Sequence, residues 1–211
     1  THTHKQTTHC RVGKISSCVV RGICTSDSIP HKIYLSPRNA VKAAALKGDF
    51  PDIIEVMDSN EAVVANSDII FIGLLPGVAR EILPSLDFAS GDSKQVVSMM
   101  ATIDIAEMRT LTKLHPERVV RTVPLPSSAR GEGPCLVHPI LPAFLSILKV
   151  FSTPIGCEDE IEMKPLVALT GHISSFFELM NVTEKFMVSK GVNSNAARGK
   201  ITHEVFPQSL I

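Results

Sequence analysis

The first candidate for chemistry is a turn with a single glycine near the start of the chain. In dinucleotide-binding turns of the form G-x-G-x-x-G/A, glycines let the backbone approach a pyrophosphate that rests on the next helix N-terminus. Here Arg11 occupies the first glycine position, Gly13 the second, and the small Ser16 the third. An ordinary helix start is the alternative interpretation. The predicted cofactor contacts in this turn are Gly13, Lys14 and Ile15.

A second polar group follows the short strand expected at residues 32–35. It consists of Ser36, Arg38 and Asn39. At this point of a dinucleotide-binding fold an acidic side chain binds the NAD ribose, whereas an arginine receives the 2′-phosphate of NADP. The group contains no acid, and a hydroxyl with a guanidinium suits a phosphate. We therefore predict NADP as the cofactor, with a solvated turn as the alternative.

The elements that must position these residues alternate along the chain. Short apolar runs bounded by turn residues predict strands, and apolar residues at helical spacing predict helices. Strands are expected at residues 32–35, 53–56, 68–75, 95–99 and 119–123, and helices at 12–23, 41–46, 60–65, 78–83 and 104–114. Asn60 is the expected N-cap of its helix, and Asp104 with Glu107 forms the expected capping box. The polar segment 1–10 is interpreted as a degraded or replaced first strand.

This alternation predicts an α/β fold, a Rossmann-like and mostly parallel sheet with helices on both faces. Between Gly133 and Cys157 the pattern loosens, and only one helix ending at Val150 is expected. Beyond Glu160 the chain is all helical, with helices at 161–169, 174–190 and 195–204. We therefore expect an NADP-binding domain over residues 1–157 and an all-helical segment over 158–211.

The composition restricts the class of protein. The 211 residues carry no formal net charge and are 44% hydrophobic, so no basic surplus points to nucleic acid or to a membrane surface. No apolar run is long enough for a membrane span, and no signal-peptide core precedes the fold. Five cysteines without a CxxC pair favour reduced thiols and a cytoplasmic location. No metal site is predicted, because His2, His4 and His9 could chelate an ion only weakly.

Three segments in this order and spacing carry a resemblance to a known family. Residues 32–39 read Lys-Ile-Tyr-Leu-Ser-Pro-Arg-Asn, residues 60–76 run from a helix into a buried strand that ends in Pro76, and residues 121–133 read Arg-Thr-Val-Pro-Leu-Pro-Ser-Ser-Ala-Arg-Gly-Glu-Gly. The chain thereby resembles pyrroline-5-carboxylate reductase, an NAD(P)H-dependent imine reductase that makes proline. The resemblance implies hydride transfer from NADPH to the C=N bond of a small imino acid. It also implies that Asn60, Leu75 and Pro76 lie beside the cofactor.

The sequence departs from that family where the substrate binds. Leu75 stands where the family has a lysine, and Leu125 stands where it has an asparagine near the imine. The family's Ser-Gly-Ser-Gly-Pro-Ala loop, which holds the substrate carboxylate, is replaced at 170–175 by Thr-Gly-His-Ile-Ser-Ser. The family's later Gly-Gly-Thr-Thr motif lies beyond Ile211, the last residue of this sequence. The remaining catalytic candidates are His172, Ser174 and Ser175.

Two further expectations concern partners and alternatives. The predicted helices 174–190 and 195–204 are too apolar for one small domain to cover, which predicts a homodimer or a higher homo-oligomer. The lost donors leave two alternatives open. One is a catalytically weak or silent NADP-binding scaffold on the same fold, and the other is a reductase of another small substrate.

Overall fold

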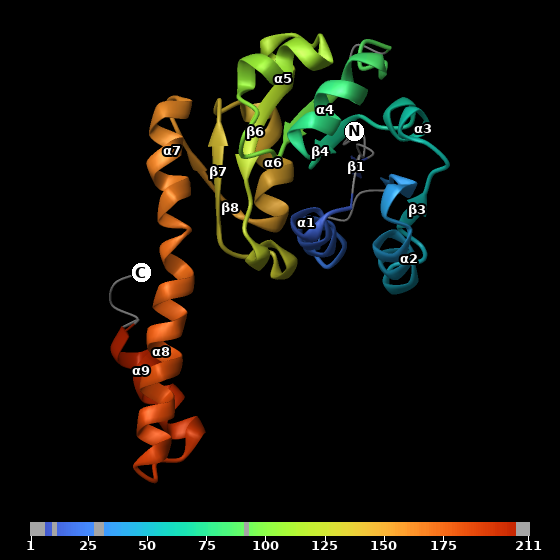
Figure 1. Ribbon diagram of the computed structural model, residues 1–211. Coiled ribbons are helices and arrows are strands. Elements are labelled where there is room, and N and C mark those ends of the chain that lie inside the picture. The colour runs from blue at the N-terminus through green and yellow to red at the C-terminus, as the bar shows by residue number, and fades with distance from the viewer. Residues whose placement is uncertain (1–6, 10–11, 28–31, 91–92, 206–211) are drawn as a thin grey trace. The chain divides into compact units, whose positions relative to one another are not determined.

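A computed structural model of the chain describes residues 7–9, 12–27, 32–90 and 93–205. Among these residues the strands form one sheet in the order β3-β2-β1-β4-β5-β6-β7-β8 (Figure 1). The strands are β1 (Thr7–His9), β2 (Ile33–Leu35), β3 (Ile54–Val56), β4 (Ile69–Ile72), β5 (Gln95–Ser98), β6 (Val119–Val123), β7 (Pro134–His138) and β8 (Thr153–Gly156). Every pairing is parallel except that of β6 with β7. The predicted Rossmann-like, mostly parallel sheet is confirmed.

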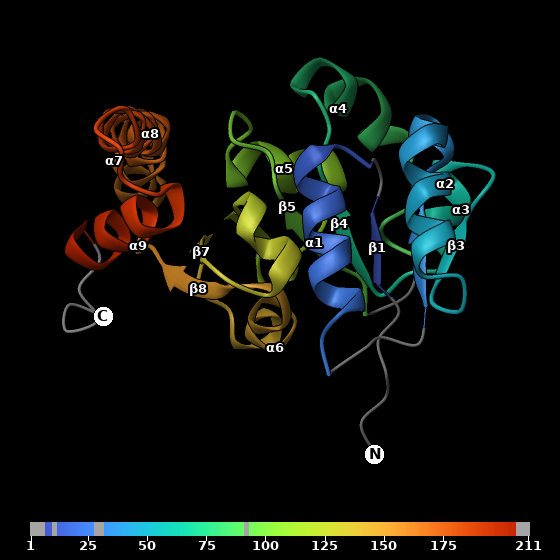
Figure 2. The ribbon, with the colours of Figure 1, turned by 90° about the horizontal axis from the view of Figure 1, so that it is seen from below.

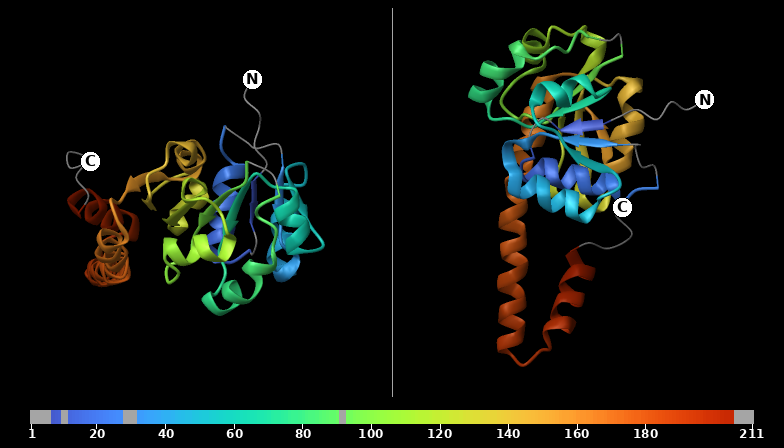
Figure 3. Two further views of the ribbon diagram at one scale, coloured as in Figure 1. Left: turned by 90° about the horizontal axis from the view of Figure 1, so that it is seen from above. Right: turned by 90° about the vertical axis from the view of Figure 1, so that its right-hand side faces the viewer.

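Helices cover both faces of this sheet, as the sequence predicts. They are α1 (Lys14–Cys24), α2 (Ala40–Asp49), α3 (Asn60–Ala65), α4 (Pro76–Ile82), α5 (Ile105–Thr112) and α6 (Pro142–Phe151), with the short 3-10 helices η1 (Pro37–Asn39), η2 (Leu83–Ser85), η3 (Pro116–Arg118) and η4 (Pro126–Arg130). Figure 2 shows the sheet from the side that α1 and α2 cover, and Figure 3 shows the ribbon from two further directions. Two separate hydrophobic clusters result, one beneath α1, α2 and α6 and one beneath α3, α4 and α5.

Strand β4 shows how one run of apolar residues serves both clusters. Ile69 and Phe71 belong to the first cluster, and Ile70 and Ile72 belong to the second. All four side chains are buried, because successive residues of a strand point to opposite faces and both faces are covered. The continuous apolar run in the sequence is therefore the signature of a central parallel strand.

The first strand lies where a Rossmann fold requires it. Thr7–His9 pairs with β2 on one side and with β4 on the other. The rest of the polar segment, including Cys10 and Arg11, lies outside the described residues. The pairing uses backbone groups only, so a strand poor in large apolar residues can still hold this position.

Two local predictions were wrong in detail. Ser59, not Asn60, caps α3, because the Ser59 side chain accepts a hydrogen bond from the Ala62 N–H and Asn60 is already the first helical residue. Asp104 caps α5 as predicted, by accepting from the Glu107 N–H at 2.7 Å. Glu107 does not close the capping box, since its carboxylate pairs with Arg80 on α4.

The loosely patterned region after Gly133 contains two strands that the sequence analysis missed. Strand β7 runs antiparallel to β6 and buries Cys135 and Val137 on one face. Strand β8 pairs with β7, and most of its residues are partly or fully exposed. Prolines at 134 and 154 obscured both strands in the sequence, because proline is tolerated at a strand start and at an edge.

The chain divides into two compact units, Thr1–Met163 and Lys164–Ile211. Helix α7 (Glu160–Leu169) crosses this division, and α8 (His172–Ser189) and α9 (Ser194–Val205) belong to the second unit. The sequence analysis placed its boundary six residues earlier, near Cys157. Within the second unit Glu184 of α8 accepts hydrogen bonds from Ser194 at 2.7 Å and from Arg198 at 2.8 Å, which ties α8 to α9.

No helix among the described residues combines the length and the hydropathy that crossing a membrane requires.

Candidate functional site

The candidate site lies at the edge of the sheet where the parallel strands end. The chain builds β1, β2 and β3 toward one side and then returns to place β4 on the other side of β1. In open parallel sheets, ligands bind outside the carboxyl ends of the strands at this change of direction. The turns that follow β1, β2 and β4 therefore contain the residues to examine.

The glycine turn places an uncapped helix N-terminus at this edge. Gly13 is the N-cap of α1, and as a glycine it has no side chain with which to cap the first turn. The Gly13 carbonyl accepts bonds from the Ser17 N–H and from its hydroxyl. A Cβ added to Gly13 would meet nothing within 4 Å. The N–H groups of a first helical turn have no partner within the helix, and such groups beside open space are the arrangement that anions use at helix N-termini. Lys14 next to the turn is exposed and Ile15 is half-buried.

The third position of the turn shows why only a small residue fits there. Ser16 is buried, and it lies against Gly73 at the end of β4. A Cβ on Gly73 would lie 2.7 Å from the Ser16 hydroxyl and 3.3 Å from the Met99 methyl group. Helix α1 therefore packs onto the sheet at a distance that larger residues would prevent, as in dinucleotide-binding folds. The sequence analysis missed this role of Gly73.

Two of the predicted cofactor residues, Ser36 and Asn60, are buried and form a hydrogen bond with each other. The Ser36 hydroxyl donates a 2.8 Å hydrogen bond to the Asn60 Oδ1, and both side chains are buried. The Ser36 oxygen also accepts a long bond from the Arg38 N–H. The predicted contact between Ser36 and a phosphate would thus require this hydroxyl to leave Asn60. The geometry makes Ser36 a support for Asn60.

Arg38 and Asn39 occupy different positions in the same turn. The Arg38 side chain is exposed at the surface, and its charge reaches Glu61. The pKa of Glu61 is lowered by hydrogen bonds from its own backbone N–H and from Ser59, with a further contribution from Arg38. Asn39 is half-buried, and its amide donates to the Val12 carbonyl at 2.9 Å. It thereby fastens the turn after β2 to the turn after β1.

Leucines occupy the two positions at which the resembling family has a lysine and an asparagine. Leu75 is the N-cap of α4 and is 62% exposed, and Pro76 begins that helix. Leu125 is half-buried and directly precedes η4. The positions that follow β4 and β6 thus present leucine side chains, which cannot donate a hydrogen bond to a carboxylate or to an imine nitrogen.

The predicted catalytic residues lie in the second compact unit. His172 is the first residue of α8 rather than part of a loop, and the helix begins two residues earlier than predicted. Both His172 and Ser175 are exposed, and the Ser174 hydroxyl donates to the Gly171 carbonyl at 3.1 Å. These three residues form a group of their own at a helix start, and they belong to a different unit from the cofactor residues.

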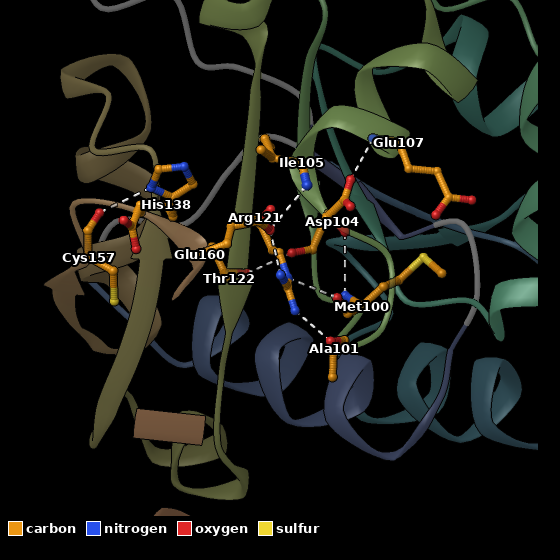
Figure 4. A network of polar contacts seen from close by, with 12 residues as sticks. Met100, Ala101, Asp104, Ile105, Glu107, Arg121, Thr122, His138, Cys157 and Glu160 are labelled. Atoms are coloured by element: carbon orange, nitrogen blue, oxygen red, sulfur yellow. Dashed lines mark hydrogen bonds and ion pairs between the residues drawn. The ribbon is translucent and has the colours of Figure 1, made fainter. Parts of the chain in front are cut away.

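Sequence analysis missed a buried charged network beside the site (Figure 4). Arg121 lies in the middle of β6 with 7% exposure. Its guanidinium donates to the carbonyls of Met100 and Ala101 and pairs with the Glu160 carboxylate. The signal in the sequence was a single arginine within the apolar run 119–123, since charged residues are almost never buried unless they are paired.

The thiols and potential metal ligands add no reactive group. Burial raises the pKa of Cys24 and that of Cys135 to about 12, so both thiols stay protonated at neutral pH. Cys18 is half-buried, and the four cysteines in the described parts of the chain are free. Within those same parts, no three His, Cys, Asp or Glu side chains gather in a way that could hold a metal ion. His2 and His4 lie outside the described residues.

Comparison with known proteins agrees with this geometry. Residues 12–102 match the model of a family described as NADP oxidoreductase, coenzyme F420-dependent. The pyrroline-5-carboxylate reductase of Coxiella burnetii aligns with a TM-score of 0.78 at 17% identity, covering 97% of this chain and 78% of that one. The pyrroline carboxylate reductase of Plasmodium falciparum, solved with NADP bound, aligns with a TM-score of 0.74 at 16% identity, covering 96% and 76%. A reductive aminase of Aspergillus terreus, in complex with NADPH and ethyl levulinate, aligns with a TM-score of 0.63 at 17% identity, covering 98% and 74%.

These likenesses establish the fold. The chain has the fold of pyrroline-5-carboxylate reductases and of reductive aminases, and at these identities it resembles a divergent relative of them. The resemblance inferred from the sequence is confirmed at this level. The family model covers the segment that contains the glycine turn, Arg38, Asn60 and Leu75, which is the predicted cofactor edge.

Proposed function

We propose that this protein is an NADP-dependent reductase that acts on the C=N bond of a small imine. The observation that carries the proposal is the overlap of two independent results. Residues 12–102 match a family of NADP oxidoreductases, and the same residues form an uncapped helix N-terminus and an arginine turn at the strand ends. An open N-terminus beside a cationic turn suits a dinucleotide that carries an additional phosphate.

The residues present fit the cofactor. The open space at Gly13 and the free N–H groups of α1 suit a pyrophosphate, and Lys14 adds a positive charge there. Exposed Arg38 suits the 2′-phosphate, and Asn60, held by Ser36, suits the adjacent ribose. When bound, the nicotinamide ring supplies the hydride. The protein contributes binding and orientation.

The range of possible substrates is limited by the absence of hydrogen-bond donors at positions 75 and 125. A substrate with a carboxylate requires a cationic or amide donor, and Leu75 and Leu125 provide neither. The groups left to hold a carboxylate or to protonate an imine nitrogen are His172, Ser174 and Ser175. We propose that pyrroline-5-carboxylate, and with it a role in proline biosynthesis, is the first substrate to test. A cyclic imine without a carboxylate is the second.

A second candidate function follows from the same leucines. A protein that binds NADP without turning over an imine, a scaffold on a reductase fold, needs the cofactor edge but no proton donor. Two measurements separate the candidates. NADPH binding, followed by the fluorescence of the reduced nicotinamide, is expected for both. Consumption of NADPH in the presence of an imine is expected for the reductase alone.

The activity assay measures NADPH oxidation at pH 7 with each of the two imines. We expect pyrroline-5-carboxylate to be reduced at least ~100-fold more slowly than by a reductase with a full donor set, the scale for losing one or two such groups. His172→Ala is expected to remove most of the remaining rate. The absence of NADPH binding at millimolar concentration would rule out both candidate functions. An unimpaired rate with pyrroline-5-carboxylate would contradict the reasoning on the leucines.

We further propose a homodimer formed through the second unit, in the cytoplasm. Helix α8 exposes apolar side chains along its whole length, each between 36% and 64% exposed. They are Ile173, Phe176, Phe177, Leu179, Val182, Phe186 and Val188. An apolar surface of this kind on a small unit is characteristic of an interaction site. The free cysteines support a reducing compartment.

A further inference from the structure

The Arg121 side chain forms hydrogen bonds to the start of the loop between β5 and α5. Arg121 uses three different nitrogens for three acceptors: Nε donates to the Met100 carbonyl at 3.2 Å, Nη2 to the Ala101 carbonyl at 2.5 Å, and Nη1 to Glu160. Figure 4 shows the Arg121 guanidinium between Glu160 and the loop residues Met100 and Ala101. Two consecutive peptide carbonyls are therefore turned toward the interior, and the plane of the loop is fixed.

Glu160 keeps the guanidinium in this position. Its Oε1 accepts from Arg121 and, at 3.1 Å, from the Ile105 N–H in the first turn of α5. The side chain of Arg121 is 8% exposed and that of Glu160 is 18% exposed. A buried arginine without its carboxylate would be costly, so Glu160 is a requirement for placing a cation under this loop. The loop is thus fixed at its start by Arg121 and at its end by Glu160.

The position of this loop makes the network relevant to the cofactor. A dinucleotide-binding sheet consists of two halves, and the residues that read the adenosine ribose follow β2 in the first half. The nicotinamide therefore belongs to the second half, which β4, β5 and β6 form here. Met100 and Ala101 lie two and three residues beyond Ser98, the last residue of β5, at the carboxyl edge of that half. Arg121 holds the carbonyls of this loop, and so the orientation of its peptide groups, at that edge.

We propose, on the basis of the function proposed above, that Arg121 is a positioning residue for the nicotinamide half of NADP(H). It acts through the Met100 and Ala101 carbonyls, and Glu160 holds it in place for that purpose. Because each of its three nitrogens already donates to a protein oxygen and its side chain is only 8% exposed, we assign Arg121 to the loop rather than to a substrate carboxylate. The network should therefore affect binding of the nicotinamide end and leave binding of the adenosine end unchanged.

The test compares two ligands on two matched variants. NADPH contacts both halves of the sheet, whereas adenosine 2′,5′-bisphosphate carries the adenine and the 2′-phosphate without nicotinamide. Arg121→Lys retains a positive charge for Glu160 but loses the planar fork that reaches two carbonyls. Arg80→Lys is the control, because Arg80 also pairs with a glutamate through two bonds, at 2.6 Å and 3.2 Å, but donates to neither carbonyl of this loop.

We expect Arg121→Lys to lower the affinity for NADPH about tenfold, which is the scale of one lost charge-assisted hydrogen bond. The affinity for the bisphosphate should change by less than about twofold. Arg80→Lys should change neither. Glu160→Gln, which keeps the acceptor oxygen and loses the charge, should give a smaller loss with the same selectivity for NADPH. Equal weakening of both ligands by Arg121→Lys, or no weakening, would overturn the inference while the proposed function stands. A wild-type protein that binds neither ligand would overturn both.

Discussion

Replacing Gly22 with alanine should destabilise the protein, although alanine is the better helix former. Gly22 lies within α1, and a Cβ there would be 1.9 Å from the Ser128 carbonyl oxygen of η4 and 3.1 Å from the Phe151 Cβ of α6. Ordinary contact begins near 3.4 Å, so α1 or η4 would have to retreat by roughly 1.5 Å. Such overpacking costs about 1–3 kcal/mol, and a backbone oxygen cannot move aside as a side chain can. We expect the upper end, about 3 kcal/mol.

The matched control is Gly48→Ala in α2, where an added Cβ would meet nothing within 4 Å. There the same substitution should stabilise the folded protein by about 0.4–1 kcal/mol, because alanine has the higher helix propensity and makes the unfolded chain less flexible. Thermal unfolding followed by far-ultraviolet circular dichroism measures both variants. For a chain of this size the expected shifts are roughly 6–12 °C downward for Gly22→Ala and 1–4 °C upward for Gly48→Ala. If Gly22→Ala melts at or above the wild type, the close packing of α1 against η4 is wrong.

Three further predictions concern the cofactor and the assembly. Arg38→Ala should weaken the binding of NADPH by about 1.5–3 kcal/mol and leave the binding of NADH unchanged in parallel fluorescence titrations. Equal affinity of the wild-type protein for the two cofactors would contradict the assignment of Arg38 to the 2′-phosphate. Ser36→Ala leaves the buried Asn60 Oδ1 without its 2.8 Å donor and should cost about 1–3 kcal/mol of unfolding free energy in urea titrations, whereas an unchanged midpoint would mean that Asn60 finds another donor. Phe177→Asp and Phe186→Asp, at positions 60% and 58% exposed, should each convert a dimer to monomer in sedimentation experiments at tens of micromolar, and a wild-type monomer at that concentration would refute the proposed interface.

The regular part of the fold could be read from the sequence because its signals are local. The apolar run at 69–72 gives its position directly, since a nonpolar strand that is buried on both faces needs consecutive apolar residues. The spacing of Gly13 and Ser16 located the helix N-terminus at the predicted cofactor edge. In each case the residues that form the element are neighbours in the chain, so one stretch of sequence contains the physical reason.

Long-range pairing could not be read in this way. Strands β7 and β8 exist because β6 offers an edge to β7 and β7 then offers one to β8. Each strand contains a proline, Pro134 or Pro154, which argues against a strand when the sequence is read locally. Arg121 and Glu160 are 39 residues apart, and Ser36 and Asn60 are 24 apart. Nothing local distinguishes such a pair from two solvated side chains.

The sequence by itself determined which residues alternate between core and surface, and hence the order of the elements from α1 to β6 and the edge of the sheet at which a dinucleotide is predicted to bind. Only the tertiary structure decided that the Ser36 hydroxyl supports Asn60 and that Arg121 holds two peptide carbonyls rather than remaining free for a substrate. The reason is that a buried polar group must find a partner wherever the fold brings one within reach, and that partner depends on packing between distant segments.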